Sequence, residues 1–260
     1  KTLGIAKNIS NALPEMENRP MLITLPLPED ADAIVQNFKI SLNSEITTIQ
    51  ALARASDRNS TDHEIILMVD VGDLREGIMP EDVLKTVREI LEIRSDHLKF
   101  SGLGTNLACC SGTLPDEKNM NLLQELAIDI EKYIGHPVKT ISVGGSVPVD
   151  WLEHHDLPSK INQIRVGEVF FIGYNTSVNK KPSDFFYDVF IIKGQILEIK
   201  EKPSVPWGVR GCDAFGRIPQ FEDRGIRKRV ILDFGLTDTD PASLIPFLKG
   251  VEIINSNSNY

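Results

Sequence analysis

The stretch Asn-Gln-Ile-Arg-Val-Gly-Glu-Val-Phe-Phe-Ile-Gly, residues 162–173, joins a short β-forming run to an arginine and a glycine. Arg165 closes the run, and Gly167 lets the backbone bend and approach a ligand closely. A guanidinium beside a glycine N–H is a common way to hold a phosphorylated ligand. An arginine in this position can equally form a surface ion pair. The stretch gains weight because it is the last of several similar strand ends.

Upstream of this stretch, apolar runs alternate with segments of helical periodicity. The sequence predicts six strands, at residues 21–27, 38–42, 65–71, 99–103, 139–143 and 163–166. This alternation is typical of an α/β protein with a parallel sheet and crossover helices. Six successive units favour a barrel over an open sheet, and a complete barrel has eight. We therefore expect a (β/α)8-type barrel that lacks about two units at its N-terminal side, in a chain that looks cut at both ends.

The pattern changes after about residue 181. Segments 184–192, 195–202 and 229–233 have the composition of strands, with Gly, Pro and Asp turns between them and little helical periodicity. We expect a partial barrel domain at residues 1–180, followed by a partial β-rich domain at residues 181–260.

Composition excludes several classes of protein. The net charge is −9 and the pI is about 5.1, so a basic surface for nucleic acid is not expected. The sequence contains no apolar run of about 18 residues, the length that a membrane helix needs. Cys109, Cys110 and Cys212 form no disulfide framework, which favours a reducing cytoplasm. The adjacent Cys109 and Cys110 do not suit zinc, and no metal site is predicted.

The strand ends carry the candidate site, because chemistry in a barrel lies at the C-terminal ends of the strands. Glycines and a serine there suit a phosphate, and two arginines can donate to an oxygen and to an aromatic nitrogen. Together they fit pyridoxal phosphate (PLP). Alternatively, the glycines serve turns and the arginines pair with Asp70 and Glu168. The positions concerned are Asp70-Val-Gly-Asp-Leu-Arg75-Glu-Gly77, Gly104-Thr-Asn106, Gly144-Gly145-Ser146 and Arg165-Val-Gly167.

The pattern Asp-x-Gly-x-x-Arg-x-Gly at residues 70–77, with Arg-x-Gly at residues 165–167, resembles the alanine-racemase-like, fold-type III PLP enzymes. Further segments resemble the ornithine racemase branch of that family, so that the similarity covers nearly the whole chain. These segments are residues 40–45, 66–77, 104–107, 162–167, 213–217 and 221–227.

The resemblance implies a barrel that holds PLP and a β-domain that completes the active site of a partner subunit in a homodimer. Arg165 would face the pyridine nitrogen, with Asn106 as its partner where alanine racemases have histidine. A guanidinium does not give up its proton, which favours returning a proton to Cα over transamination. The phosphate would be held by Gly145, Ser146 and Gly167, and the phenolic oxygen side by Arg75.

The sequence also departs from the family. The family's Schiff-base lysine lies at the end of the first barrel strand, and neither Lys1 nor Lys7 follows an apolar run, so this lysine is absent from the chain. Segment 211–216 lacks the tyrosine base of alanine racemases. It resembles instead the Cys-Asp segment of ornithine and diaminopimelate decarboxylases. The resemblance makes Cys212 a candidate acid/base and Asp213 a ligand for a distal ammonium, whereas a lone cysteine can equally be a small buried residue.

The sequence therefore predicts a PLP-dependent racemase of a basic amino acid, ornithine first and lysine next. One base removes the α-proton and another returns it from the opposite face. Two alternatives stay open. A non-catalytic PLP carrier would need no β-domain after residue 181, and Cys212 with Asp213 would also suit a fold-type III decarboxylase.

Overall fold

The computed structural model describes residues 19–213 and 216–259. They fall into two compact units that divide between Val189 and Phe190. The domain limits of 1–180 and 181–260 stay predictions.

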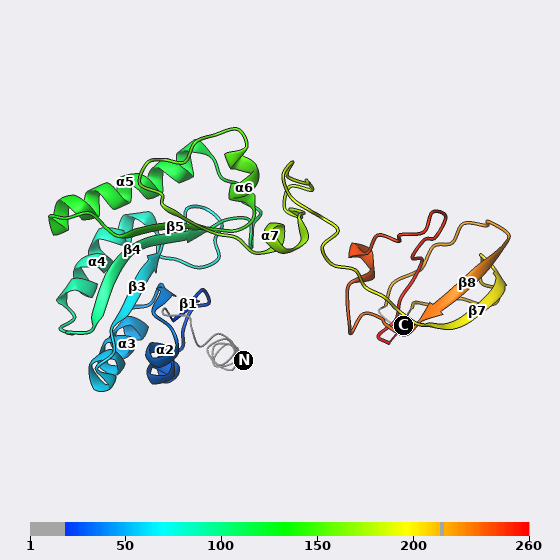
Figure 1. Cartoon of the computed structure of the whole chain (residues 1–260), viewed down its shortest axis with the longest axis horizontal. Coiled ribbons are helices and arrows are strands. Elements are labelled where there is room, and N and C mark those ends of the chain that lie inside the picture. Colours follow the sequence, from blue (N-terminus) through cyan, green and yellow to red (C-terminus); the bar gives the residue numbers. More distant parts are fainter. Residues whose placement is uncertain (1–18, 214–215, 260) are drawn as a thin grey trace. The chain divides into compact units, whose positions relative to one another are not determined.

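The first unit is built on one six-stranded parallel sheet that curls along its width (Figure 1). The order of the strands in the sheet is their order in the chain. A barrel is wound in this way, whereas an open doubly wound sheet reverses direction at one point. The prediction of a barrel-type sheet of six βα units is therefore confirmed. The strands are β1 (Met21–Leu22), β2 (Ile40–Asn43), β3 (His63–Met68), β4 (Leu98–Asn106), β5 (Thr140–Gly144) and β6 (Gln163–Arg165).

Helices follow the strands and cover one face of this sheet (Figure 1). The longest helix, α5 (Glu117–Ile134), begins at a capping box. Asp116 accepts from the N–H of Asn119 at 2.7 Å, and the Asn119 side chain accepts from the Asp116 N–H at 3.0 Å. It ends at Gly135, where φ is +80°. The helical elements are η1 (Pro28–Asp30), α2 (Ala31–Asn37), α3 (Ile46–Asn59), η2 (Pro80–Asp82), α4 (Val83–Glu92), α5 (Glu117–Ile134), α6 (Val147–Leu152) and α7 (Glu168–Ile172).

None of the described helices combines the length and the hydropathy that crossing a bilayer requires.

The two faces of the sheet differ in chemistry, because side chains alternate along each strand. One face carries Ile65, Leu67 and Val69 into the large core beneath the helices. The other face carries a small apolar cluster of Leu42, Ile66 and Met68 at β2 and β3. On β4 to β6 the residues of this second face are mostly glycine and polar side chains, namely Gly102, Gly104, Asn106, Ser142, Gly144, Gln163 and Arg165.

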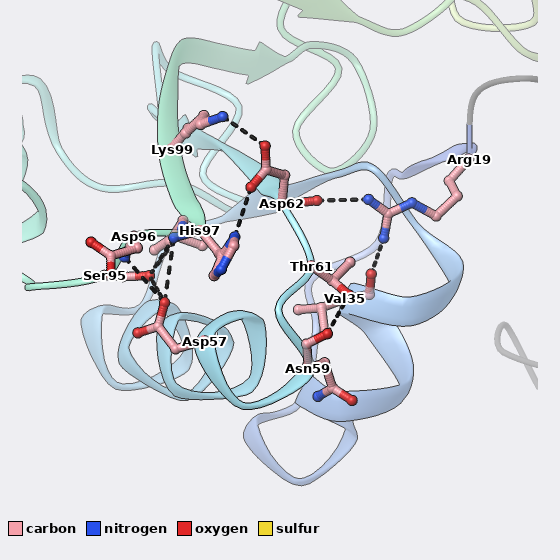
Figure 2. A network of polar contacts seen from close by, with 11 residues as sticks. Arg19, Val35, Asp57, Asn59, Thr61, Asp62, Ser95, Asp96, His97 and Lys99 are labelled. Atoms are coloured by element: carbon pink, nitrogen blue, oxygen red, sulfur yellow. Dashed lines mark hydrogen bonds and ion pairs between the residues drawn. The ribbon is translucent and has the colours of Figure 1, made fainter.

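A polar network ties together the amino edge of the sheet, where β3 and β4 begin (Figure 2). The Asp62 carboxylate accepts from Nζ of Lys99 at 2.8 Å and lies 2.9 Å from Nδ1 of His97. The hydrogen bond from Lys99, and then that from His97, lowers the pKa of Asp62 to about 2. Asp57 accepts from Oγ of Ser95 at 2.7 Å. This network lies at the edge opposite to the strand ends that carry the candidate site, so we assign it to the fold.

His63 makes the stability of the first unit depend on pH. Its buried ring donates from Nδ1 to the oxygen of Phe38 at 3.1 Å and accepts at Nε2 from Oγ of Ser41 at 2.8 Å. Burial lowers the pKa of His63 to about 4, so the unfolded chain binds this proton more tightly than the folded one. The contribution of the neutral His63 ring to the free energy of unfolding is fully present above the ordinary histidine pKa of about 6.5. It is lost as the pH falls towards 4, and the loss is about 2 kcal/mol at pH 5. In urea unfolding, the drop in the free energy of unfolding between pH 7 and pH 5 should be smaller for His63→Gln than for the unsubstituted protein. Equal drops in the two proteins would contradict this.

The second unit contains an antiparallel pair, β7 (Ile196–Pro203) and β8 (Ile226–Leu232), and a short helix, η3 (Pro241–Ser243). Two predicted strands, 195–202 and 229–233, overlap this pair. The strand predicted at residues 184–192 is wrong: the segment has no strand in the structure. Its aromatic and β-branched residues suit a strand, but a strand also needs a hydrogen-bonded neighbour, and the described residues offer none there.

Candidate active site

Arg165 closes β6 and lies half-buried on the polar face of the sheet. Its Nη2 donates to the backbone oxygen of Thr105 at 2.8 Å and to Oδ1 of Asn106 at 2.9 Å, and its Nη1 donates to Oγ of Ser142. Burial lowers the pKa of Arg165 to about 10, against the opposing charge of Glu76. The guanidinium is therefore a fixed, protonated cation at neutral pH.

Asn106 connects Arg165 to the loop after β3. Its Nδ2 donates to Oε1 of Glu76, whose side chain is only 12% exposed. The other carboxylate oxygen, Oε2, lies 3.2 Å from Nε of Arg75, close enough for an ion pair. It is buried and accepts no well-formed hydrogen bond from the described residues. Arg75, Glu76, Asn106 and Arg165 thus form one continuous chain of polar contacts.

Two glycines after β5 make room for this chain. A Cβ on Gly144 would overlap both Oδ1 of Asn106 and Nη2 of Arg165. Gly145 has φ +112°, donates its N–H to the backbone oxygen of Arg165 at 3.1 Å, and would bring a Cβ within 2.7 Å of the Leu107 oxygen. Both positions require glycine because neighbouring groups occupy the space of a side chain.

Ser146 lies beside the first turn of α7, which Gly167 precedes. Oγ of Ser146 accepts from the N–H of Val169 at 3.1 Å. Gly167 immediately precedes α7, and a Cβ placed there would meet no atom within 4 Å. Open space beside a hydroxyl and backbone N–H groups can accommodate a small anion.

Asp73 joins the loops after β3 and β4. It is 2% exposed and accepts from the N–H groups of Cys109 and Cys110, each at 3.0 Å. Leu74 and Ala108, next to these bonds, have φ of +53° and +58°, which non-glycine residues seldom adopt. Such backbone strain persists only where surrounding contacts enforce it, and it is frequent at functional sites.

The alternative ion pairs considered for the two arginines are wrong. Asp70 accepts from the backbone N–H groups of Gly72 and Leu74, and Glu168 accepts from Thr176. Arg75 pairs with Glu76 instead. Arg165 forms no ion pair within the described part of the chain, and its partners are neutral oxygens.

The predicted site residues therefore divide between the two units. The first unit joins Arg75 to Asn106 and Arg165 through Glu76, places Gly145 on the backbone of Arg165, and sets Ser146 beside the turn that contains Gly167. Their roles toward a cofactor stay proposals. Three contributing residues were missed, namely Glu76, Ser142 and Gly144. Glu76 and Gly144 lie inside the quoted strand-end motifs, and Ser142 shares the strand face of Gly144.

Cys212 and Asp213 belong to the second unit. Cys212 is exposed, and the backbone N–H of Arg217 donates to the Asp213 carboxylate at 2.9 Å. The next two residues of this segment, and Lys1 and Lys7, lie outside the described residues. The loops that follow β1 to β6 in the described chain contain no lysine.

Comparison with known proteins identifies the family of this chain. Residues 6–175 match the model of the alanine racemase N-terminal domain. The chain is 36% identical to ornithine racemase of Acetoanaerobium sticklandii over 249 residues, which are 95% of this chain and 70% of that protein. It is 36% identical to lysine racemase of Thermotoga maritima over 240 residues, 92% of this chain and 66% of that protein. An alanine racemase structure from Clostridium difficile 630 is similar in fold, with a TM-score of 0.56 and 17% identity over 91% of this chain and 64% of that one. The chain therefore belongs to the family of the alanine racemase N-terminal domain.

Proposed function

We propose that this protein is a PLP-dependent racemase of a basic amino acid, with ornithine as the first candidate substrate and lysine as the second. The observation that carries the proposal is the 36% identity to both an ornithine racemase and a lysine racemase over more than nine tenths of the chain. The chain spans about two thirds of the length of these relatives, so the substrate and the activity are proposals for the whole protein.

The residues at the strand ends fit PLP. Arg165 is a half-buried, protonated donor suited to the ring nitrogen, and Asn106 accepts from it. The open turn at Gly167, with Gly145 and Ser146, suits the phosphate, and the half-exposed Arg75 suits the phenolic oxygen side. When bound, PLP supplies the electron withdrawal that makes the Cα–H bond of an amino acid acidic.

The chain's own groups then determine the outcome at Cα. Because Arg165 keeps its proton, it would donate to the ring nitrogen and leave that nitrogen unprotonated, which would favour returning a proton to Cα over transamination. Cys212 is proposed to move a proton at Cα, and Asp213 to bind the distal ammonium of the substrate. An unpaired buried ammonium is costly, so a carboxylate there selects basic side chains.

A homodimer and a cytoplasmic location belong to the same proposal. The family resemblance supports the homodimer. The three cysteines, all free within the described structure, support the cytoplasmic location. Free thiols are typical of a reducing compartment.

The test is incubation of this chain, extended by a segment that supplies the Schiff-base lysine of the family, with PLP and either L-ornithine or L-lysine in D₂O. We expect loss of optical rotation, with one deuterium entering at Cα. Release of carbon dioxide would indicate the decarboxylase that the Cys-Asp pair also suits. PLP absorbance without either reaction, across a panel of amino acids, would indicate the carrier. Absence of PLP binding would overturn the proposal.

A further inference from the structure

Glu76 is a nearly buried carboxylate that lies between two guanidinium groups. One of its oxygens accepts from Nδ2 of Asn106, and the other lies 3.2 Å from Nε of Arg75. Arg165 is reached through Asn106 and interacts with the charge of Glu76 without direct contact. Burying a carboxylate is costly unless the charge is paired and hydrogen-bonded. The position of Glu76 therefore calls for a structural or functional explanation.

The hydrogen bonds define which way the Asn106 amide faces. Arg165 has only donors, so it requires the amide oxygen, and a carboxylate has only acceptors, so it requires the amide nitrogen. The observed orientation satisfies both, with Oδ1 at 2.9 Å from Nη2 of Arg165. A flipped amide would set donor against donor and acceptor against acceptor. Without Glu76, the Asn106 nitrogen would lose the partner that excludes the flipped state.

We propose that Glu76 is a positioning residue that locks the Asn106 amide and thereby holds the Arg165 guanidinium in one orientation at the candidate site. Its carboxylate also supplies the negative charge that balances Arg75 and the half-buried Arg165. Glu76 touches neither substrate nor cofactor in this role and acts through Asn106. The relevance to PLP rests on the proposed function, whereas the locking of the amide can be measured in the protein alone.

The test uses Glu76→Gln, which keeps the size of the side chain and removes its charge. Because a glutamine amide can donate as well as accept, this variant no longer requires the Asn106 nitrogen to face it. Glu125→Gln, at an exposed glutamate of α5, is the matched control. In a ¹⁵N-labelled protein, Asn106→Ser identifies the side-chain NH₂ signals of Asn106. Glu76→Gln should shift or broaden these signals, and Glu125→Gln should leave them in place. Unchanged signals in Glu76→Gln would overturn the proposal.

A double-mutant cycle then tests whether Glu76 acts through Asn106 on PLP. We expect Glu76→Gln and Asn106→Ser each to raise the dissociation constant for PLP about tenfold, with the double variant also near tenfold. An additive loss near a hundredfold, or PLP binding unaffected by Glu76→Gln, would overturn the proposal. If the unsubstituted protein bound no PLP, the proposed function would fail, and the Asn106 signals would still decide the role of Glu76.

Discussion

Replacing Arg165 with methionine should strongly lower both the free energy of unfolding and the affinity for PLP. Methionine fills a similar volume but leaves the Thr105 oxygen and Oδ1 of Asn106 buried without their donor. Unpaired buried acceptors cost about 1–3 kcal/mol each, so the free energy of unfolding should fall by about 3 kcal/mol. Loss of one charge-assisted hydrogen bond to the ring should weaken PLP binding about 100-fold. Urea unfolding of the PLP-free protein and titration with PLP measure the two effects separately.

Arg58→Met is the matched control for Arg165→Met. Arg58 pairs with Asp32 at 2.6 Å, but both side chains are more than half exposed. Exposed ion pairs contribute little, so this variant should unfold and bind PLP almost as the unsubstituted protein does. If Arg165→Met changed stability and PLP binding no more than Arg58→Met does, the guanidinium of Arg165 would have neither role.

The strand ends could be predicted from the sequence because a simple physical rule places them. Parallel strands end at one edge of a sheet, so Asn106, Gly145 and Arg165 could be assigned to the same edge before their contacts were known. The pairing of Arg165 with Asn106, which the family resemblance implied, is confirmed: the two residues lie on the same face, on β6 and β4, with Gly144 of β5 between them. Alternation of apolar and helical segments was likewise enough to predict all six strands of the first unit.

The partners of these residues could not be predicted in the same way. Glu76 lies in a loop whose path depends on the positive φ of Leu74 and on hydrogen bonds to Asp70, and no periodicity encodes either feature. The sequence therefore suggested Asp70 and Glu168 as ion-pair partners, whereas in the structure Arg75 pairs with Glu76 and Arg165 bonds to neutral oxygens. The predicted strand at residues 184–192 failed for a related reason, because its composition carries no information about a pairing partner.

Gly144→Ala should show how tightly the site is packed, since it adds a single methyl group. The Cβ would overlap Oδ1 of Asn106 and Nη2 of Arg165, and neither can move without losing its other hydrogen bonds. Overpacking of this kind costs about 1–3 kcal/mol, and we expect a value near the upper end in urea unfolding. Displacement of Arg165 should also weaken PLP binding about 100-fold, as removal of its guanidinium does.

The control for Gly144→Ala is Gly167→Ala, which adds the same methyl group at the other end of the site. The Gly167 backbone has φ −123° and ψ −90°, which alanine adopts only with some strain, whereas its Cβ would meet no atom within 4 Å. Gly167→Ala should therefore lower the free energy of unfolding by only about 1 kcal/mol, through the backbone alone. Equal stability losses in the two variants would mean that position 144 needs glycine for its backbone conformation. A clearly larger loss in Gly144→Ala would mean that this glycine serves the contact between Asn106 and Arg165, because only there does the added methyl group meet neighbouring atoms.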